Sequence, residues 1–330
     1  MSDVLVLSRR DVARVLDVRD CIDAVERAFR QHAAGTTIPP GVLGATVDGG
    51  GFHMKTAGLL DGRPIFAAKV NANFPGNPAR FGLPTIQGVI ALFDAERGEP
   101  LALLDSAEIT SLRTAAATAV AAKHLAREDA AVATVCGCGE QGRSQLRALA
   151  AVRPLRTVLA FDADAGSAER YAAEMARELG VRVTAVSDLA SATRRSDVVV
   201  TCTTARRWVL GRGDVAPGAF IAAVGADNPE KQEIEPALMA ESAVVVDVLE
   251  QCERIGDLHH AIAAGTMTRE DVAADLADVV SGRRPGRRRD DEIVVFDSTG
   301  TALQDVAAAW LAYERALAGG VGVTLDLGGR

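Results

Sequence analysis

Residues 131–142 read Ala131-Val-Ala-Thr-Val-Cys136-Gly137-Cys138-Gly139-Glu140-Gln141-Gly142. An apolar, strand-like run is followed by three glycines with the spacing G-x-G-x-x-G and then by a stretch typical of a helix. Gly137 allows a tight turn, Gly139 lets the backbone approach a diphosphate, and Gly142 lets the helix pack close to the strand. The helix N-terminus offers free N–H groups to an anion. This segment therefore predicts a strand–loop–helix unit that binds a dinucleotide.

The acidic residue that follows the next strand-like run indicates which dinucleotide is bound. That run, Thr157–Phe161, is followed by Asp162. A carboxylate at this strand end accepts hydrogen bonds from both ribose hydroxyls and repels a 2′-phosphate. Asp162 could also cap the following helix, and the two roles are compatible. We therefore expect NAD rather than NADP, and a nicotinamide cofactor implies hydride transfer, with a structural or regulatory dinucleotide as the alternative.

Strand-like and helical stretches alternate from residue 130 onward. The strand-like runs are Ala131–Cys136, Thr157–Phe161, Val181–Val186, Val198–Thr203, Phe220–Val224 and Val244–Val248. Continuous Val-rich runs separated by helices are typical of a parallel sheet that is covered on both faces. The pattern predicts an α/β fold with a doubly wound sheet of the Rossmann type.

The N-terminal part has a different pattern. Two helices are expected at Arg9–Leu16, with Ser8 as N-cap, and at Arg19–Ala34. Short apolar or alternating runs then follow one another without helices, at Val42–Val47, Phe52–Ala57, Ile65–Val70, Ile86–Phe93 and Leu101–Leu104. They predict an antiparallel or mixed sheet.

Two further helices define the expected domains. An alanine-rich helix, Ala107–Ala126, leads away from this sheet, and the last helix, Ala302–Leu317, is expected to return to it. We expect residues 1–118 and 302–330 to form a split α+β domain for substrate binding and dimerisation. Residues 119–301 would form the Rossmann domain that binds NAD. A lone split domain would leave a sheet edge and an apolar face exposed, which favours a dimer.

Composition excludes several other classes of protein. The 330 residues are 48% hydrophobic and 24% charged, as in a globular chain of two domains. Lys and Arg number 36 against 44 Asp and Glu, which argues against a nucleic-acid-binding protein. The sequence opens without the pattern of a secretory leader and has no run of 18 apolar residues, so we expect no membrane span and a cytoplasmic location.

The cysteines and one arginine-rich run are expected to have no role in the site. Five scattered cysteines are interpreted as free thiols. Cys136 and Cys138 lie in the glycine loop and have no second Cys/His pair at ligand spacing, so we expect no metal. The run Arg283–Arg289 is followed at once by three acidic residues and is interpreted as a solvated loop rather than as an anion site.

Six motifs in one order and spacing match a known family. They are Lys69-Val-Asn71 with Pro75-Gly-Asn-Pro78, Gly82-Leu-Pro-Thr85, Ser111-Leu-Arg113-Thr-Ala-Ala116, the glycine loop, Ala223-Val-Gly225-Ala-Asp227-Asn-Pro-Glu-Lys231-Gln-Glu233 and Phe296-Asp-Ser298-Thr-Gly300. With them the sequence resembles the ornithine cyclodeaminase/mu-crystallin family over almost the whole chain. That family includes cyclodeaminases, an archaeal-type alanine dehydrogenase, ketimine reductases and crystallins. The resemblance implies a homodimer whose split domain supplies the interface.

The resemblance also implies which residues line the site. Those expected to bind the cofactor are Thr85, Arg113, Gly137, Gly139, Glu140, Gln141, Gly142, Asp162, Thr201, Ile221, Ala222, Ala223, Val224, Lys231 and Ser298. Those expected to line the substrate are Lys69, Arg113, Asp227 and Thr299.

Three of these residues suit an α-amino or α-imino acid. Arg113 offers a two-donor fork and Lys69 a compact charge to a substrate carboxylate. Asp227 is able to take or give a proton at the substrate nitrogen or at a water. We therefore expect Lys69 and Asp227 to be catalytic. Taken singly, each residue has another reading, as a solvent-facing lysine, a helix-surface arginine or a turn aspartate.

The sequence departs from the family pattern at the expected substrate wall. A cation usually follows the Pro-Pro pair, but here Pro39-Pro40 precedes Gly41. Lys55 and Arg80 are the candidates to replace that cation at the substrate, and for each the alternative is a surface charge. Cyclodeaminases carry an acid where this chain has Phe52, and this difference weighs against a diamino acid substrate.

Three functions remain open. The first is an NAD-dependent oxidoreductase acting on an α-amino acid or its imine, either as an amino acid dehydrogenase or as a ketimine reductase. The second is a cyclodeaminase, a lyase that recycles NAD within one turnover. The third is a non-catalytic, crystallin-like carrier, against which the presence of Lys69, Arg113 and Asp227 argues.

Overall fold

The protein divides into two compact units in the computed structural model, which describes residues 3–327. Unit 1 contains the chain up to Arg113 together with the segment from Thr301 onward, and unit 2 is Thr114–Gly300. The sequence pattern places the first boundary slightly later, after residue 118. Both positions lie within one long helix, and no break in its sequence marks where one unit ends and the other begins. Within residues 3–327, no helix has the length and apolarity needed to cross a membrane.

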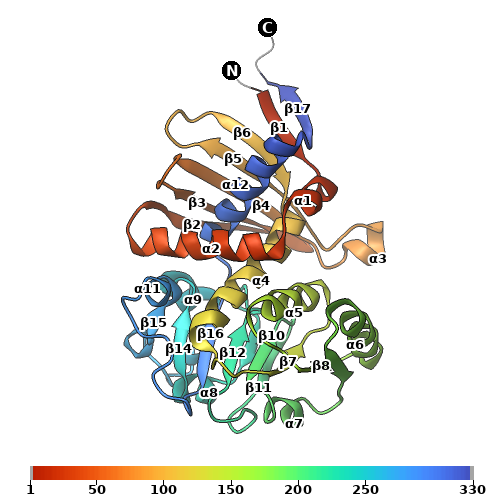
Figure 1. Cartoon of the computed structure of the whole chain (residues 1–330), viewed down its shortest axis with the longest axis vertical. Coiled ribbons are helices and arrows are strands. Elements are labelled where there is room, and N and C mark those ends of the chain that lie inside the picture. Colours follow the sequence, from red (N-terminus) through yellow and green to blue (C-terminus); the bar gives the residue numbers. More distant parts are fainter. Residues whose placement is uncertain (1–2, 328–330) are drawn as a thin grey trace. The chain divides into compact units, whose positions relative to one another are not determined.

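Unit 2 contains the predicted doubly wound sheet. Its eight strands are all parallel and have the order β15-β14-β16-β12-β10-β7-β8-β9. The strands are β7 (Val132–Cys136), β8 (Thr157–Phe161), β9 (Arg182–Ala185), β10 (Val198–Thr201), β12 (Phe220–Ala223), β14 (Ala243–Val246), β15 (Ala274–Asp275) and β16 (Val294–Asp297). The central strands are buried because helices enclose them, and Figure 1 shows this arrangement.

The remaining elements of unit 2 connect these strands. They are α5 (Glu140–Val152), α6 (Ala165–Leu179), α7 (Leu189–Thr193), α8 (Pro236–Glu241), α9 (Leu249–Ile255), α10 (Asp257–Ala263) and α11 (Leu276–Val280), with the short pair β11 (Arg206–Leu210) and β13 (Gln232–Ile234) and a 3-10 turn at Arg269–Asp271. α4 (Ser106–Leu125) begins in unit 1 and ends in unit 2.

The register of unit 2 brings five strand ends into one row. Cys136 pairs with Phe161 on one side and with Thr201 on the other. Thr201 then pairs with Ala223, and Ala223 with Asp297. In a parallel sheet all carboxyl ends lie at one edge, and β7 lies between β8 and β10, where the chain reverses its order of strand addition. Residues that follow these strands therefore meet along a single edge.

Unit 1 is a mixed sheet with helices on one face. Its seven strands have the order β17-β1-β6-β5-β4-β3-β2, and all pairs except β1–β6 are antiparallel. The elements are β1 (Asp3–Leu7), α1 (Arg9–Val15), α2 (Val18–Ala33), β2 (Thr37–Val47), β3 (Gly50–Leu59), β4 (Ile65–Asn73), α3 (Asn77–Phe81), β5 (Ile86–Asp94), β6 (Pro100–Asp105), α12 (Ala302–Gly319) and β17 (Val323–Asp326). Helix α12 packs against β3, β4 and α2, as Figure 1 shows.

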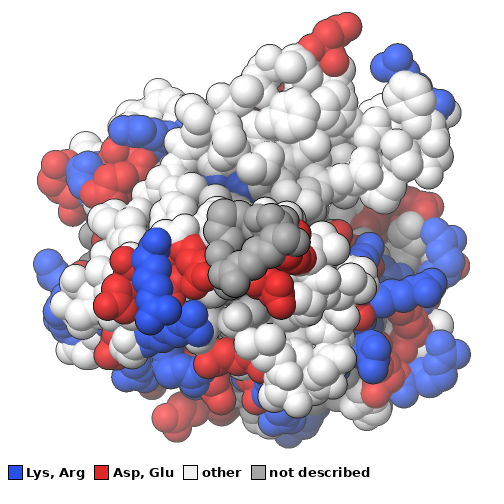
Figure 2. Space-filling model, turned by 90° about the horizontal axis from the view of Figure 1, so that it is seen from above, with Lys and Arg blue, Asp and Glu red and all other residues white. Residues whose placement is uncertain are grey.

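The other face of the unit 1 sheet is apolar and open. Leu43, Met54, Val70 and Val89 form one row across β2, β3, β4 and β5. Leu43, on the edge strand β2, and Val89, on β5 in the middle of the sheet, are 62% and 51% exposed, so this row forms an exposed apolar strip. The upper part of Figure 2 shows a broad surface area without charged side chains. The described part of unit 1 contains nothing that covers this face.

Six strands were not expected from the sequence, namely β1, β11, β13, β15, β16 and β17. β1 and β17 are short runs at the ends of the chain, and they pair with each other. β16 overlaps the motif Phe296-Asp-Ser298-Thr-Gly300, in which the polar residues suggested a binding site and not a strand. A run of four or five apolar residues does not distinguish a strand from a loop or a helix end, so local pattern alone misses such elements.

The glycine loop gives a direct test of this packing. A Cβ on Gly142 would fall on the backbone oxygen of Gly137, whereas a Cβ on Gly139 would meet nothing within 4 Å. We expect Gly142→Ala to lower the free energy of unfolding by about 1–3 kcal/mol, because the helix must move away from the strand. Thermal unfolding followed by near-ultraviolet circular dichroism measures the effect. Gly139→Ala is the matched control, and equal stabilities of the two variants would contradict the packing described here.

Candidate functional site

The glycine loop of unit 2 has the geometry that a diphosphate needs. Gly137 adopts φ +105°, a conformation that side chains rarely allow, and its N–H donates to the Phe161 carbonyl at 2.9 Å. Gly139 is the N-cap of α5, and no side chain caps that helix end. The first N–H groups of α5 are therefore available to an anion, and the open space at Gly139 lets an anion approach the backbone.

Asp162 lies beside this loop with its carboxylate held in place. One oxygen accepts a hydrogen bond from the Cys138 N–H at 2.8 Å, and the other accepts from the Asp164 N–H at 3.0 Å. Asp164, not Asp162, is the N-cap of α6, because its side chain accepts from the first N–H groups of that helix. The capping alternative for Asp162 is therefore wrong. Each oxygen of Asp162 has a second lone pair available for a ribose hydroxyl.

A cavity of about 400 Å³ opens at this edge of the sheet. It is lined by Cys136, Gly137, Gly139, Phe161, Asp162, Ala163, Cys202, Thr203, Thr204, Ala205 and Val209. Donor N–H groups, an acidic residue and apolar walls thus converge in one place. This is the combination that an adenosine diphosphate moiety needs, so the residues of this chain fit a dinucleotide.

A buried carboxylate braces the loops at the same edge. Glu233 accepts hydrogen bonds from the Thr201 hydroxyl at 2.7 Å, from the Gly225 N–H at 2.8 Å and from the N–H and hydroxyl of Thr203. Burial raises the pKa of Glu233, although the four donors act in the opposite direction. Glu233 thereby ties the segment after β10 to the segment after β12. Glu233 lies in one of the six motifs, but the local sequence predicts no role for it.

Ser298 and Thr299 take part in a second internal network. Asp247 accepts from the Ser298 hydroxyl at 3.1 Å, from the Thr299 hydroxyl at 3.2 Å and from the Gly300 N–H at 2.7 Å. Gln251 donates to the Thr299 hydroxyl at 2.7 Å. Both predicted residues are thus buried and oriented by neighbours in unit 2. No local sequence pattern points to Asp247 or Gln251.

The other predicted residues of unit 2 fall into three environments. The side chains of Ile221, Ala222 and Ala223 are completely buried in β12, and Val224 follows at the strand end. Glu140 is exposed and Gln141 is half-buried in the first turn of α5. Asp227 follows β12 and is exposed, and its carboxylate accepts from the Lys231 ammonium at 2.7 Å.

Unit 1 contains a buried ion cluster that includes two predicted residues. The Nζ of Lys69 lies 2.8 and 2.7 Å from the two carboxylate oxygens of Asp305. The Nε of Arg113 lies 2.8 Å from the same carboxylate, and its Nη1 donates to Gln304 at 2.6 Å. Lys69, Arg113 and Asp305 are 3%, 5% and 1% exposed. The solvent-facing readings of Lys69 and Arg113 are therefore wrong.

Burial dominates the electrostatics of Lys69. Loss of water lowers the pKa of the Lys69 ammonium to about 7, although the Asp305 charge acts to raise it. Burial alone would raise the pKa of Asp305, but the charges of Arg113 and Lys69 outweigh burial and hold it below its ordinary value. Lys69 is thus a group that gains or loses a proton near neutral pH.

Of the two candidates for the missing cation, one lies at the cluster. Lys55 on β3 is the register partner of Lys69 on β4, and it is 9% exposed. Arg80 lies at the end of α3, where it is exposed and stacks 5.1 Å from the centroid of the Phe81 ring. The structure therefore does not place Arg80 with Lys69.

Two other residues named from the sequence lie elsewhere in unit 1. Phe52 lies three residues before Lys55 on β3, so its side chain points to the opposite face of the sheet, which is the open face. There its ring contacts the Phe74 ring edge-to-face, with 5.7 Å between the ring centroids. Its bearing on a diamino acid substrate stays a prediction. Thr85 lies before β5, and its carbonyl accepts from the Phe74 N–H at 2.8 Å.

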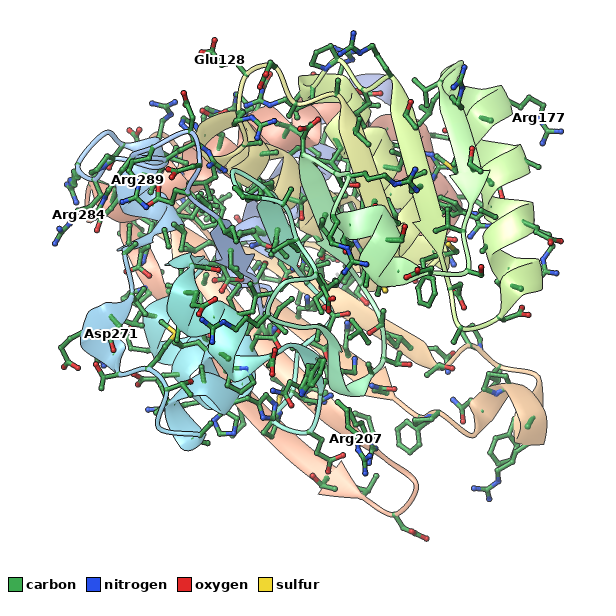
Figure 3. The ribbon with its side chains drawn as sticks, turned by 90° about the horizontal axis from the view of Figure 1, so that it is seen from below. Glu128, Arg177, Arg207, Asp271, Arg284 and Arg289 are labelled. Carbon is green, nitrogen blue, oxygen red and sulfur yellow. The ribbon has the colours of Figure 1, made fainter. Side chains whose placement is uncertain are left out.

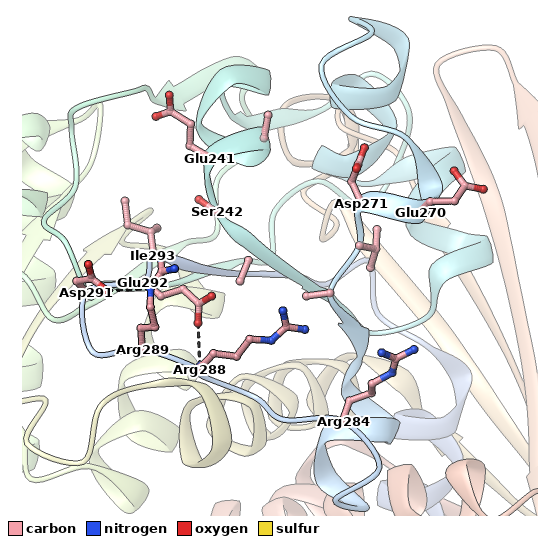
Figure 4. Close-up of a pocket in the computed structure, with 14 residues that line it drawn as sticks. Glu241, Ser242, Glu270, Asp271, Arg284, Arg288, Arg289, Asp291, Glu292 and Ile293 are labelled. Carbon is pink, nitrogen blue, oxygen red and sulfur yellow. Dashed lines mark hydrogen bonds and ion pairs between the residues drawn. The ribbon is translucent and has the colours of Figure 1, made fainter.

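A larger hollow of about 570 Å³ lies at the opposite edge of the unit 2 sheet. Figure 4 shows its mostly charged lining near the first residues of β14 and β16, which are the amino ends of these strands. It includes part of the arginine-rich run, and Figure 3 shows Arg284 and Arg289 pointing outward. Ligands of parallel sheets bind at the carboxyl ends, so we do not assign the cofactor to this hollow.

The five cysteines form no disulfide, and four of them are buried. Burial raises the pKa of the Cys138 thiol to about 12, so the glycine loop carries no thiolate at neutral pH. Within residues 3–327, no group of His, Cys, Asp and Glu side chains has an arrangement suited to a metal ion.

Comparison with known proteins places this geometry in a family. A model of the ornithine cyclodeaminase/mu-crystallin family matches residues 2–320. The alanine dehydrogenase of Archaeoglobus fulgidus is 37% identical over 97% of this chain and 97% of its own length. An archaeal alanine dehydrogenase dimer with bound NAD is 36% identical, with a TM-score of 0.94 over 99% of this chain and 100% of that chain.

A second solved structure is equally similar in fold. The Δ(1)-pyrroline-2-carboxylate reductase of Thermococcus litoralis, in complex with NADH and L-proline, is 34% identical, with a TM-score of 0.94 over 98% of this chain and 100% of that chain. The match of the family model and of these relatives extends over nearly the full length. The chain therefore belongs to the ornithine cyclodeaminase/mu-crystallin family.

Proposed function

We propose that this chain is an NAD-dependent oxidoreductase that transfers a hydride to or from the Cα of an α-amino acid or the corresponding imine. The observation that carries this proposal is the buried cluster of unit 1, in which a titratable lysine and an arginine share one aspartate. A dinucleotide carrier needs no such cluster, whereas an imine reductase needs a carboxylate anchor and a proton donor. The relatives described above bind NAD or NADH and include an alanine dehydrogenase and an imine reductase.

Each residue has a defined task in this proposal. Arg113 binds the substrate carboxylate with its fork of N–H donors. Lys69 gives a proton to the substrate nitrogen in reduction and takes it back in oxidation, as its lowered pKa allows. Asp227 is the alternative proton carrier, and it forms an ion pair with Lys231. Unit 2 would hold the dinucleotide, which would supply a hydride as NADH in reduction and accept one as NAD in oxidation.

The assay that tests this function follows NADH absorbance. Purified protein is offered 2-oxo acids with ammonia or methylamine, cyclic imino acids, and L-amino acids with NAD. We expect NADH to be consumed or formed with at least one of these substrates. Release of ammonia from a diamino acid without net change in NADH would show a cyclodeaminase instead. Dinucleotide binding without turnover on the whole panel would favour the carrier.

Asp162 predicts the choice between the two dinucleotides. In the wild type we expect NADH to bind at least tenfold more tightly than NADPH, because the fixed carboxylate repels a 2′-phosphate. Asp162→Ala should remove most of that difference. Isothermal titration calorimetry measures both dissociation constants. Tighter binding of NADPH to the wild type, or unchanged discrimination in the variant, would contradict the assignment.

Lys55 is proposed as a second anchor for the substrate. A buried charge-assisted hydrogen bond contributes about 2–3 kcal/mol, so Lys55→Ala should lower kcat/KM about 30- to 150-fold and leave the dissociation constant of NADH nearly unchanged. Lys123→Ala removes an exposed lysine and is the control. A near-normal kcat/KM for Lys55→Ala would refute the anchor, and loss of NADH binding would place Lys55 at the cofactor.

A homodimer is part of the same proposal, with the open face of unit 1 as its interface. The uncharged rows across β2–β5 support it, as does the dimeric state of the archaeal relative. Val89→Arg should produce a monomer in light scattering at micromolar concentration, because it places a charge in the centre of that face. Trp208→Arg changes an exposed apolar residue of unit 2 and should leave the mass unchanged. A monomeric wild type would contradict the dimer.

A cytoplasmic location also belongs to the proposal. It is supported by five free cysteines in a chain that forms no disulfide, which suits a reducing compartment.

A further inference from the structure

Lysine is rare in this chain. Of its 36 basic residues only Lys55, Lys69, Lys123 and Lys231 are lysines, and all the others are arginines. A guanidinium keeps its proton at any physiological pH, whereas a desolvated ammonium releases it. In a chain that otherwise uses arginine for positive charge, a buried lysine beside a buried arginine indicates that the two cations have different tasks.

Asp305 is the residue that brings these two cations together. It lies in the first part of α12, whose start is fixed by the Thr301 side chain accepting from the Leu303 N–H at 3.3 Å. Its carboxylate is 1% exposed, and both oxygens lie within 2.8 Å of the Lys69 ammonium. Arg113 contacts the same carboxylate through Nε and is held from its other side by Gln304.

We propose that Asp305 is a positioning residue that holds Lys69 beside Arg113 and keeps Lys69 charged until it gives its proton to the substrate nitrogen. The identity of the proton acceptor rests on the proposed function. The contact between Asp305 and the two cations does not.

The charges that surround Lys69 explain why such a residue is needed. Lys55 on β3 and Arg113 on α4 both act to lower the pKa of Lys69, in addition to the larger effect of burial. On β5 the register partner of Lys69 is the apolar Ile90. From α2, the Cys21 thiol contributes no charge, because burial raises its pKa to about 12. Asp305 is thus the counter-charge that acts on Lys69 within the described part of unit 1.

In reduction the substrate carbon receives the hydride, the C=N π bond breaks, and the nitrogen forms a new N–H bond with the proton of the Lys69 ammonium. Lys69 is left as a neutral amine and regains its proton from water. Reduction therefore needs protonated Lys69, so its rate should fall as the pH rises through the pKa of Lys69, near 7. Oxidation should show the opposite dependence.

The test compares wild type with Asp305→Asn in two measurements. Loss of the negative charge should lower the pKa of Lys69, so the alkaline limb of the kcat profile for reduction should move to lower pH by about 1–3 units. A merely structural role would lower kcat at every pH without moving this limb. Asp94→Asn is the matched control, because it removes the carboxylate of the Arg63–Asp94 ion pair in the same unit. It should leave the limb in place.

The second measurement needs neither substrate nor turnover. With lysine labelled by ¹³C at Cε, the intact protein gives only four lysine signals, and Lys69→Arg identifies that of Lys69. We expect this signal to titrate near pH 7 in the wild type and lower in Asp305→Asn. A wild-type signal that titrates at the ordinary lysine value of 10.5 would contradict proton donation by Lys69 near neutral pH, and an unchanged signal in Asp305→Asn would overturn the positioning role.

The two measurements separate the two proposals. A chain that reduces no imine but whose Lys69 signal responds to Asp305→Asn would contradict the proposed function and support the positioning role. An active enzyme whose Lys69 signal and pH limb are both unchanged in Asp305→Asn would overturn the positioning role and leave the proposed function standing.

Discussion

The common register of the parallel strands in unit 2 is the constraint on which the dinucleotide site depends. Because Cys136, Phe161 and Thr201 are paired across β8, β7 and β10, the segments that follow them lie at one edge. The glycine loop and Asp162 thus meet although a whole helix separates them in sequence. A shift of one residue between two strands would reverse side-chain directions and move the carboxylate away from the loop.

In unit 1 the corresponding constraint is electrostatic. Two cations lie side by side in a place without water, which is unfavourable unless a counter-ion neutralises part of their charge. Asp305 provides that counter-ion from α12, a helix that returns to the sheet from the far end of the chain. The split arrangement of unit 1 therefore has a chemical consequence: the C-terminal segment completes the ion cluster that the N-terminal strands begin.

Local sequence was sufficient to predict the Rossmann-type sheet and the position of Asp162 after the strand next to the glycine loop, because these features lie in short segments with a fixed order. The mixed sheet and the helix from Ala302 were also predicted, since their periodicity is clear. The partner of Lys69 could not be found in this way, because 236 residues separate it from Asp305. Nothing in the pattern of α12 distinguishes Asp305 from an ordinary first-turn carboxylate. Glu233 and Asp247 were missed for the same reason, since only the fold shows that they brace loops.

The transfer of labelled hydride tests the central claim most directly. An imine that the protein reduces is incubated with NADH that carries deuterium at the transferable C4 position, and the amino acid product is analysed by mass spectrometry and proton NMR. Direct hydride transfer to carbon predicts one deuterium at Cα of every product molecule, with one NADH consumed for each. A product without deuterium at Cα, or turnover that consumes no NADH, would contradict the assignment of this chain as an oxidoreductase acting at Cα.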